Sequence, residues 1–109
     1  MKLFMRIFAI CENEQSAHEI STAITDYLRD FSPEIFSEAK QYWKIPSFFE
    51  FTFTVSPANQ ETFRLIIASC ENGWLHMNNE NDASSVWNRS ENSTFLSPAI
   101  EWAEVSLHA

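Results

Sequence analysis

The stretch that most constrains how this chain can fold is residues 48–55, FFEFTFTV. Its side chains alternate, and the apolar side of the alternation consists of Phe49, Phe51, Phe53 and Val55. A period of two is typical of a half-buried β-strand. Three phenylalanines and a valine on one side need an apolar cover, which the amphipathic segments on either side of this stretch can supply. We therefore expect residues 48–55 to form a central strand of a sheet with helices on one face.

Two more strands and two helices are predicted around this stretch. Residues 2–11 alternate in the manner of a second central strand, and residues 35–45 form a weaker one, with Ala39, Trp43 and Ile45 inward. A capping box at Ser16 predicts a helix that ends before residue 33. Ser56, followed by a proline, predicts the start of a second helix that runs to residue 70.

A fourth strand is predicted at residues 74–78, with Leu75 and Met77 inward and Trp74 and His76 outward. The resulting order, β-α-β-β-α-β, is that of an α+β, ferredoxin-like split βαβ fold with both helices on one face of an antiparallel sheet. We expect one domain over residues 1–109, with a ferredoxin-like core at 1–78 and a C-terminal extension at 79–109.

The extension is predicted to form two short strands, at residues 85–89 and 100–107. Ile100, Ala103 and Leu107 would also suit one helical face, and we prefer the strand. These strands either extend the sheet or fold over its uncovered face. In the second case Trp87, Phe95 and Trp102 would plug that face; a second copy of the chain or a foreign protein could cover it instead.

Charge and cysteine content exclude several classes of function. The chain of 109 residues has 7 basic and 15 acidic residues, a net charge of −8, which argues against nucleic acid as a direct partner. Residues 71–109 contain six acidic residues and a single basic one, Arg89, and are the more acidic part for their length. No apolar stretch approaches a membrane span, and with only Cys11 and Cys70 we expect free thiols in a cytoplasmic protein.

Two groups of reactive side chains were considered as sites. Arg6, Glu50 and His76 are expected to project from neighbouring strands of the uncovered face, where they would hold a small ligand or form a cross-strand ion pair. Cys11, His18 and Cys70 are expected at one end of the sheet, but their spacing matches no zinc motif. The chain has no phosphate loop and no nucleophile with an evident base, so we expect no catalytic residue, no metal, no cofactor and no enzymatic activity.

The tail carries the one family resemblance. The segments Ser85-Val86-Trp87-Asn88-Arg89 and Trp102-Ala103-Glu104, together with Phe95, Pro98 and the small acidic body, resemble immunity proteins of bacterial contact-dependent growth-inhibition and related polymorphic toxin systems. The resemblance implies a cytoplasmic protein that is not an enzyme. It implies binding to a cognate toxin domain, often a basic nuclease, whose active site or substrate surface it blocks.

We expect the toxin-facing surface on the acidic last third of a monomeric chain, where charge steers association and an aromatic side chain anchors it. The expected contact residues are Glu80, Asp82, Glu91, Glu101 and Glu104, with Trp87 or Trp102 as the anchor. The alternative is a homodimeric ferredoxin-like module that uses Arg6, Glu50 and His76 on the uncovered face to hold a small ligand or to regulate another domain.

Overall fold

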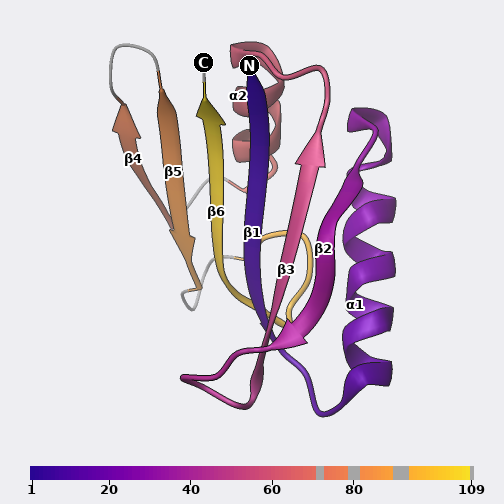
Figure 1. The fold of residues 1–109 in the computed structure, drawn as a ribbon. Coiled ribbons are helices and arrows are strands. Elements are labelled where there is room, and N and C mark those ends of the chain that lie inside the picture. The colour runs from indigo at the N-terminus through magenta and orange to yellow at the C-terminus, as the bar shows by residue number, and fades with distance from the viewer. Residues whose placement is uncertain (71–72, 79–81, 90–93, 109) are drawn as a thin grey trace.

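The computed structural model describes residues 1–70, 73–78, 82–89 and 94–108. Its strands form one six-stranded sheet in the order β2-β3-β1-β6-β5-β4, with every neighbouring pair antiparallel (Figure 1). The predicted α+β class with an antiparallel sheet is therefore confirmed. In chain order the elements are β1 (Lys2–Ile10), α1 (Glu14–Tyr27), the 3-10 turn η1 (Arg29–Phe31), β2 (Glu34–Gln41), β3 (Phe48–Val55), α2 (Gln60–Ala68), β4 (Trp74–Asn78), β5 (Ala83–Asn88) and β6 (Ile100–His108).

The strand order differs from the predicted ferredoxin-like order in one respect. The predicted order sets β4 beside β1, but β6 holds that position and β4 forms the far edge of the sheet. β6 has nine residues and pairs along the whole of β1, whereas β4 has only five. A strand near the centre must fill the core along its length, and Ala103, Val105 and Leu107 of β6 do so. The segment expected to be an extension thus supplies a central strand.

Both helices pack on the same face of the sheet, as the alternation in β3 predicts (Figure 1). One continuous core joins the helices to the strands. Its helical members include Ala17, Ile24, Phe63 and Ile66, and its strand members include Met5, Ile7, Phe51, Phe53 and Val105. We call the opposite side of the sheet the open face. Its side chains include Phe4, Arg6, Phe8, Glu50, Thr52, Trp102 and Glu104.

Each helix begins at an asparagine that caps it. The Asn13 side chain accepts a hydrogen bond from the Ser16 backbone N–H, and the Asn59 side chain accepts one from the Thr62 N–H, each at 2.9 Å. These bonds satisfy donors that the first helical turn leaves without partners. The predicted caps, Ser16 and Ser56, are wrong: the true cap lies three residues earlier in α1 and three residues later in α2.

The two sides of β4 are the reverse of the prediction. Trp74 pairs with Trp87 and therefore shares the helix-covered face, where its Nε1 donates to the carbonyl of Cys70 at 2.9 Å. Leu75 is 64% exposed on the other side of the strand. Indole rings fill more of the core than a leucine does, and the pairing with β5 places them there.

β2 is shorter and more exposed than predicted. The hairpin with β3 is confirmed, but β2 ends at Gln41, so the predicted inward side chains Trp43 and Ile45 lie in the connection, 80% and 42% exposed. All eight residues of β2 are exposed. The register with β3 shifts twice, which is common in strands at the edge of a sheet.

The tail forms strands, as preferred over a helix, but it does not cover the open face. Trp87 and Phe95 are fully buried on the helix-covered side, with their ring centroids 5.8 Å apart. Only Trp102 of the three predicted plugs lies on the open face, where its ring centroid is 5.3 Å from that of Phe8. The extended strands enlarge the sheet and leave its open face without a cover from the described residues.

Candidate functional site

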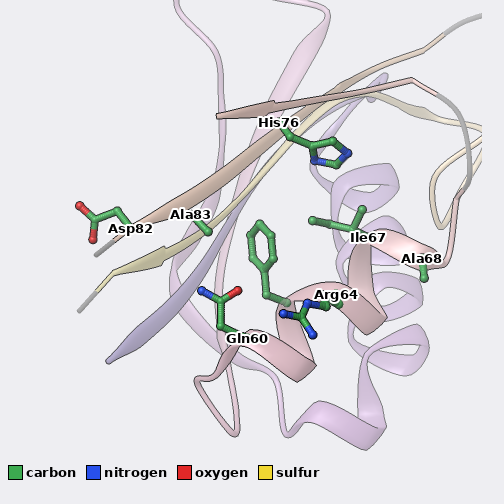
Figure 2. A pocket seen from close by; sticks show the side chains of 8 residues that line it. Gln60, Arg64, Ile67, Ala68, His76, Asp82 and Ala83 are labelled. Carbon is green, nitrogen blue, oxygen red and sulfur yellow. The ribbon is translucent and has the colours of Figure 1, made fainter. Parts of the chain in front are cut away.

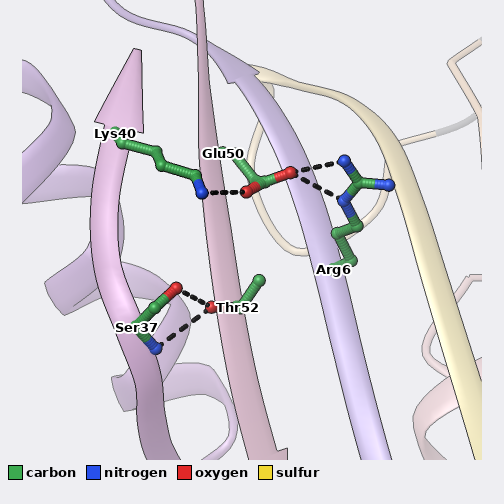
Figure 3. Close-up of polar contacts among 5 residues, drawn as sticks. All are labelled: Arg6, Ser37, Lys40, Glu50 and Thr52. Atoms are coloured by element: carbon green, nitrogen blue, oxygen red, sulfur yellow. Dashed lines mark hydrogen bonds and ion pairs between the residues drawn. The ribbon is translucent and has the colours of Figure 1, made fainter. Parts of the chain in front are cut away.

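Three charged side chains from three adjacent strands meet on the open face (Figure 3). The Nε and Nη2 atoms of Arg6, on β1, lie 2.7 and 2.5 Å from one carboxylate oxygen of Glu50 on β3, Oε2. The Nζ of Lys40, on β2, lies 3.5 Å from the other oxygen, Oε1. Glu50 is only 8% exposed, so its carboxylate needs these two cations to offset the loss of hydration.

This group is a structural ion-pair network. Both carboxylate oxygens of Glu50 are engaged, and the Arg6 guanidinium also lies 4.9 Å from the centroid of the Phe8 ring. Beside it, the hydroxyl oxygens of Ser37 and Thr52 lie 2.7 Å apart and link β2 to β3. Because the two ion pairs and the Ser37–Thr52 contact join different strands, the network holds β2, β3 and β1 in register.

His76, the predicted third member of the site, is absent from this network. It lies on the helix-covered face of β4, where its Nδ1 is 2.6 Å from the Oγ of Ser85. The prediction that Arg6, Glu50 and His76 gather on one face is wrong for the histidine, because the sides of β4 are reversed and β4 lies at the far edge.

An aromatic cleft of about 440 Å³ occupies one end of the open face. The ring centroid of Phe8 lies 4.7 Å from that of Tyr42 and 5.3 Å from that of Trp102. At its rim Arg89 and Glu101 form an ion pair at 3.0 Å. The cleft can receive a flat apolar group, with the Arg89–Glu101 ion pair at its rim.

Of the seven residues predicted to bind a partner, the structure describes five, and one of those five, Trp87, is not on the surface. Glu80 and Glu91 lie outside the described residues. The other five are Asp82 (3.6 Å from His108 Nδ1), Glu101 (paired with Arg89), Glu104 (opposite Arg6 in register), Trp102 (half-buried in the aromatic cleft) and Trp87 (fully buried). Trp87 cannot serve as a surface anchor, because its indole belongs to the core.

Most of the chain's negative charge lies near the β2 edge of the sheet, opposite the β4 edge. Residues 12–38, which include α1 and part of β2, contain seven acidic residues and one arginine, a net of −6 out of the chain's −8. All seven are exposed, and we call them the acidic edge: Glu12, Glu14, Glu19, Asp26, Asp30, Glu34 and Glu38. Arg29 Nη1 lies 3.7 Å from Asp26 Oδ1. In the described structure this is the sole ion pair that involves a residue of the acidic edge.

Exposed apolar side chains adjoin the acidic edge. On β2, Ile35 is 58% and Phe36 65% exposed, and Trp43 follows in the connection to β3. A groove of about 390 Å³ runs between α1 and β2, lined in part by His18, Ile35 and Glu38. None of these acids was among the residues predicted from the sequence to bind a partner. The sequence feature that indicates this surface is the presence of seven acidic residues within 27 positions, next to large apolar side chains.

The cysteines do not form a reactive site. Cys11 and Cys70 are both buried, whereas His18 is exposed on α1. Burial raises the pKa of the Cys11 thiol, which keeps it protonated and poorly nucleophilic. Within the described ranges, no three His, Cys, Asp or Glu side chains are placed to hold a metal ion.

Comparison of the chain with protein-family models, with curated protein sequences and with solved structures finds no match. Neither helix of the described structure has the length and apolarity needed to cross a bilayer.

Proposed function

We propose that this chain is an immunity protein that binds and neutralises a basic bacterial toxin domain. The observation that carries the proposal is the acidic edge: a net charge of −6 over residues 12–38, on exposed side chains of α1, η1, β2 and the segment before α1, next to exposed large apolar residues. The toxin partner comes from the resemblance of the tail to immunity families. The distribution of charge determines where we place the contact surface. It is now assigned to α1 and β2 instead of the last third of the chain.

The acidic edge suits a basic partner because its charge is largely unneutralised. A surface of one sign steers a partner of the other sign and raises the association rate, and this effect weakens as salt screens the charges. A nuclease domain carries a basic surface to hold its phosphate substrate. An acidic protein on that surface would exclude the nucleic acid without any catalytic group of its own.

Trp43 and Phe36 are the proposed anchors of the complex. Tryptophan is among the residues that contribute most at protein interfaces, and an indole that is 80% exposed has no role in this chain's own core. Phe36 stacks edge-on against Phe4 at 5.3 Å and still remains 65% exposed. These two replace Trp87, which is buried.

β2 also ends the sheet and is an edge to which a strand of the partner could add. The tail offers no such edge through β6, which is paired on both sides. The two register shifts in β2 limit such pairing to short segments.

The decisive experiment is co-expression with the toxin domain encoded next to this chain. We expect growth to be rescued and a complex to survive purification. Trp43→Ala should weaken the complex by about 30-fold or more, the loss typical of a hot-spot residue, without lowering the chain's own stability. Failure of rescue together with the absence of a complex would end the immunity proposal.

A matched pair of charge reversals tests the contact surface separately. Glu14 and Glu61 are both exposed glutamates in the first turn of a helix, but only Glu14 belongs to the acidic edge. Glu14→Lys should slow association by several-fold at low salt, and Glu61→Lys should leave it nearly unchanged. Equal effects of the two would move the contact surface elsewhere while leaving the immunity proposal in place.

A second candidate function is a homodimer that buries the open face around a small ligand. It is supported by the absence of a cover over that face from the described tail and by the aromatic cleft of Phe8, Tyr42 and Trp102. The mass in solution separates the two candidates. A stable dimer that protects Trp102 from solvent favours the homodimer, and a monomer favours the immunity protein.

A further inference from the structure

A second hollow, on the helix-covered side of the sheet, is independent of the proposed toxin contact. Two helices cannot cover six strands. α1 packs against β2 and α2 against β6, so the helix-covered face beside β4 and β5 is left partly open next to α2. A hollow of about 520 Å³ lies there, within the size range of small-molecule sites (Figure 2). It is at the other end of the sheet from the acidic edge.

One stripe of α2 forms the floor and one wall of this hollow. Gln60, Phe63, Arg64 and Ile67 recur at three- and four-residue spacing and therefore share one side of the helix. Phe63 and Ile67, together with Ala83 of β5, make the floor apolar. Gln60 and Arg64 add an amide and a guanidinium to the same hollow, as Figure 2 shows.

Arg64 is available to a ligand. In the ranges that the structure describes, it makes no ion pair and no hydrogen bond, and it is exposed. Its planar guanidinium can donate two parallel hydrogen bonds to a carboxylate, and the Gln60 amide can donate another. An unpaired guanidinium above an apolar floor is suited to an anion that carries an apolar body.

His76 faces Arg64 across the hollow, from β4 (Figure 2). Its Nδ1 lies 2.6 Å from the Oγ of Ser85, which is completely buried and so holds the imidazole in one orientation. When the serine hydroxyl donates to Nδ1, the ring proton is on Nε2, and that nitrogen becomes a donor to a ligand. The side chain of Asp82, at the outer end of the hollow, is directed away from it, toward His108 at 3.6 Å.

From this geometry we infer that the hollow between α2 and β4 binds a small organic carboxylate with an apolar body, held by Arg64, Gln60 and His76 above the Phe63–Ile67 floor. The guanidinium and the donors select the carboxylate, and the floor selects the apolar body. The inference does not depend on the toxin proposal, because the two surfaces are at opposite ends of the sheet and can be occupied together.

Benzoate is a suitable probe, and benzamide is its neutral counterpart of nearly the same shape. In two-dimensional amide NMR of the full chain, benzoate should shift the signals of residues 60–68 and 74–76, with a dissociation constant of about 1 mM or below, as expected for a ligand of this size. Benzamide should bind at least about 10-fold more weakly, since it has one acceptor oxygen instead of two and no negative charge to pair with Arg64.

Arg64→Gln should weaken benzoate binding by about 10-fold or more, whereas Arg29→Gln, which removes the same charge from an exposed site in η1, should change it by less than about two-fold. Both arginines are exposed, so both variants should fold. Amide signals that match those of the unsubstituted chain away from the substitution will show that they do. His76→Gln provides a further variant and should weaken binding by several-fold. Equal losses in the two arginine variants, equal binding of benzamide, or shifts outside the hollow would overturn the inference.

Discussion

Replacing Arg6 by leucine should destabilise the chain through the carboxylate it leaves behind. Glu50 is 8% exposed and would keep only Lys40, at 3.5 Å and on a side chain that is 68% exposed. Removing one partner of a fully buried ion pair costs about 3–5 kcal/mol. The Arg6 side chain is 38% exposed and Lys40 remains, so we expect a smaller loss of about 2 kcal/mol, or roughly 10 °C in melting temperature.

The double-mutant cycle isolates the interaction itself. Glu50→Leu alone should cost about 1 kcal/mol, because Arg6 can turn toward water, and the double variant should also lie within about 1 kcal/mol of the unsubstituted chain. The coupling energy is then about 2–3 kcal/mol. Urea unfolding at neutral pH, followed by the fluorescence of the chain's four tryptophans, of which Trp87 is completely buried, measures all four species.

The Arg29–Asp26 pair is the matched control for this cycle. Both of its side chains are 75% exposed and its atoms are 3.7 Å apart, so the same cycle should return a coupling below about 0.5 kcal/mol. A coupling of that small size for Arg6 and Glu50 would refute the argument that burial makes this pair structural. A double variant as unstable as the sum of the single ones would refute it equally.

Three further outcomes are expected from buried and strained positions. Phe51→Ala should lower the free energy of unfolding by about 3–5 kcal/mol, whereas Trp43→Ala should change it by less than about 0.5 kcal/mol, as urea unfolding can establish. Gly73→Ala should cost about 1–3 kcal/mol, because φ at this position is +102° and the new Cβ would lie 2.6 Å from Nε1 of Trp87; a melting temperature equal to that of the unsubstituted chain would contradict this. Native Cys11 should react with a thiol reagent more slowly at pH 8 than it does in urea, because burial raises its pKa and lowers its thiolate fraction; equal rates in the two states would count against it.

The parts of the fold that could be predicted are those in which one side of an element is clearly apolar. The alternation in residues 48–55 predicted the side of β3 that is buried, and Phe51 and Phe53 are each 1% exposed. The same reasoning held for β1, in which Met5 and Ile7 are fully buried. In such segments a shift by one residue would expose the whole apolar side, so the local pattern is sufficient.

β4 could not be oriented from its own residues. In WLHMN, Trp74 is on one side and Leu75 and Met77 are on the other, so both sides are apolar and the alternation does not choose between them. The choice depends on Phe95 and Trp87, which pack around the Trp74 ring, and these come from distant parts of the chain. The position of β4 at the edge also could not be predicted from its own residues, since it depends on β6 taking the place beside β1.

The contact surface proposed from the structure differs in location from the one predicted from the sequence. The sequence predicts an acidic surface with an aromatic anchor in the last third, which has the higher acidity of the two parts of the chain, but residues 12–38 alone hold a net charge of −6. Trp43 was predicted to be inward because it continued the alternation of β2, and the strand ends at Gln41 before reaching it. Neither the end of that strand nor the burial of Trp87 follows from local spacing.

The place of β6 in the sheet has a consequence for how the chain is made. Residues 100–108 are synthesised after all the other strands, yet they lie between β1 and β5 and are hydrogen-bonded to both. Until they leave the ribosome, β1 has an unpaired edge, and the β4–β5 hairpin has no sheet to join. Nascent chains arrested before residue 100 should therefore be degraded by proteases or retained by chaperones, and folding should occur in one late step rather than from the N-terminus onward.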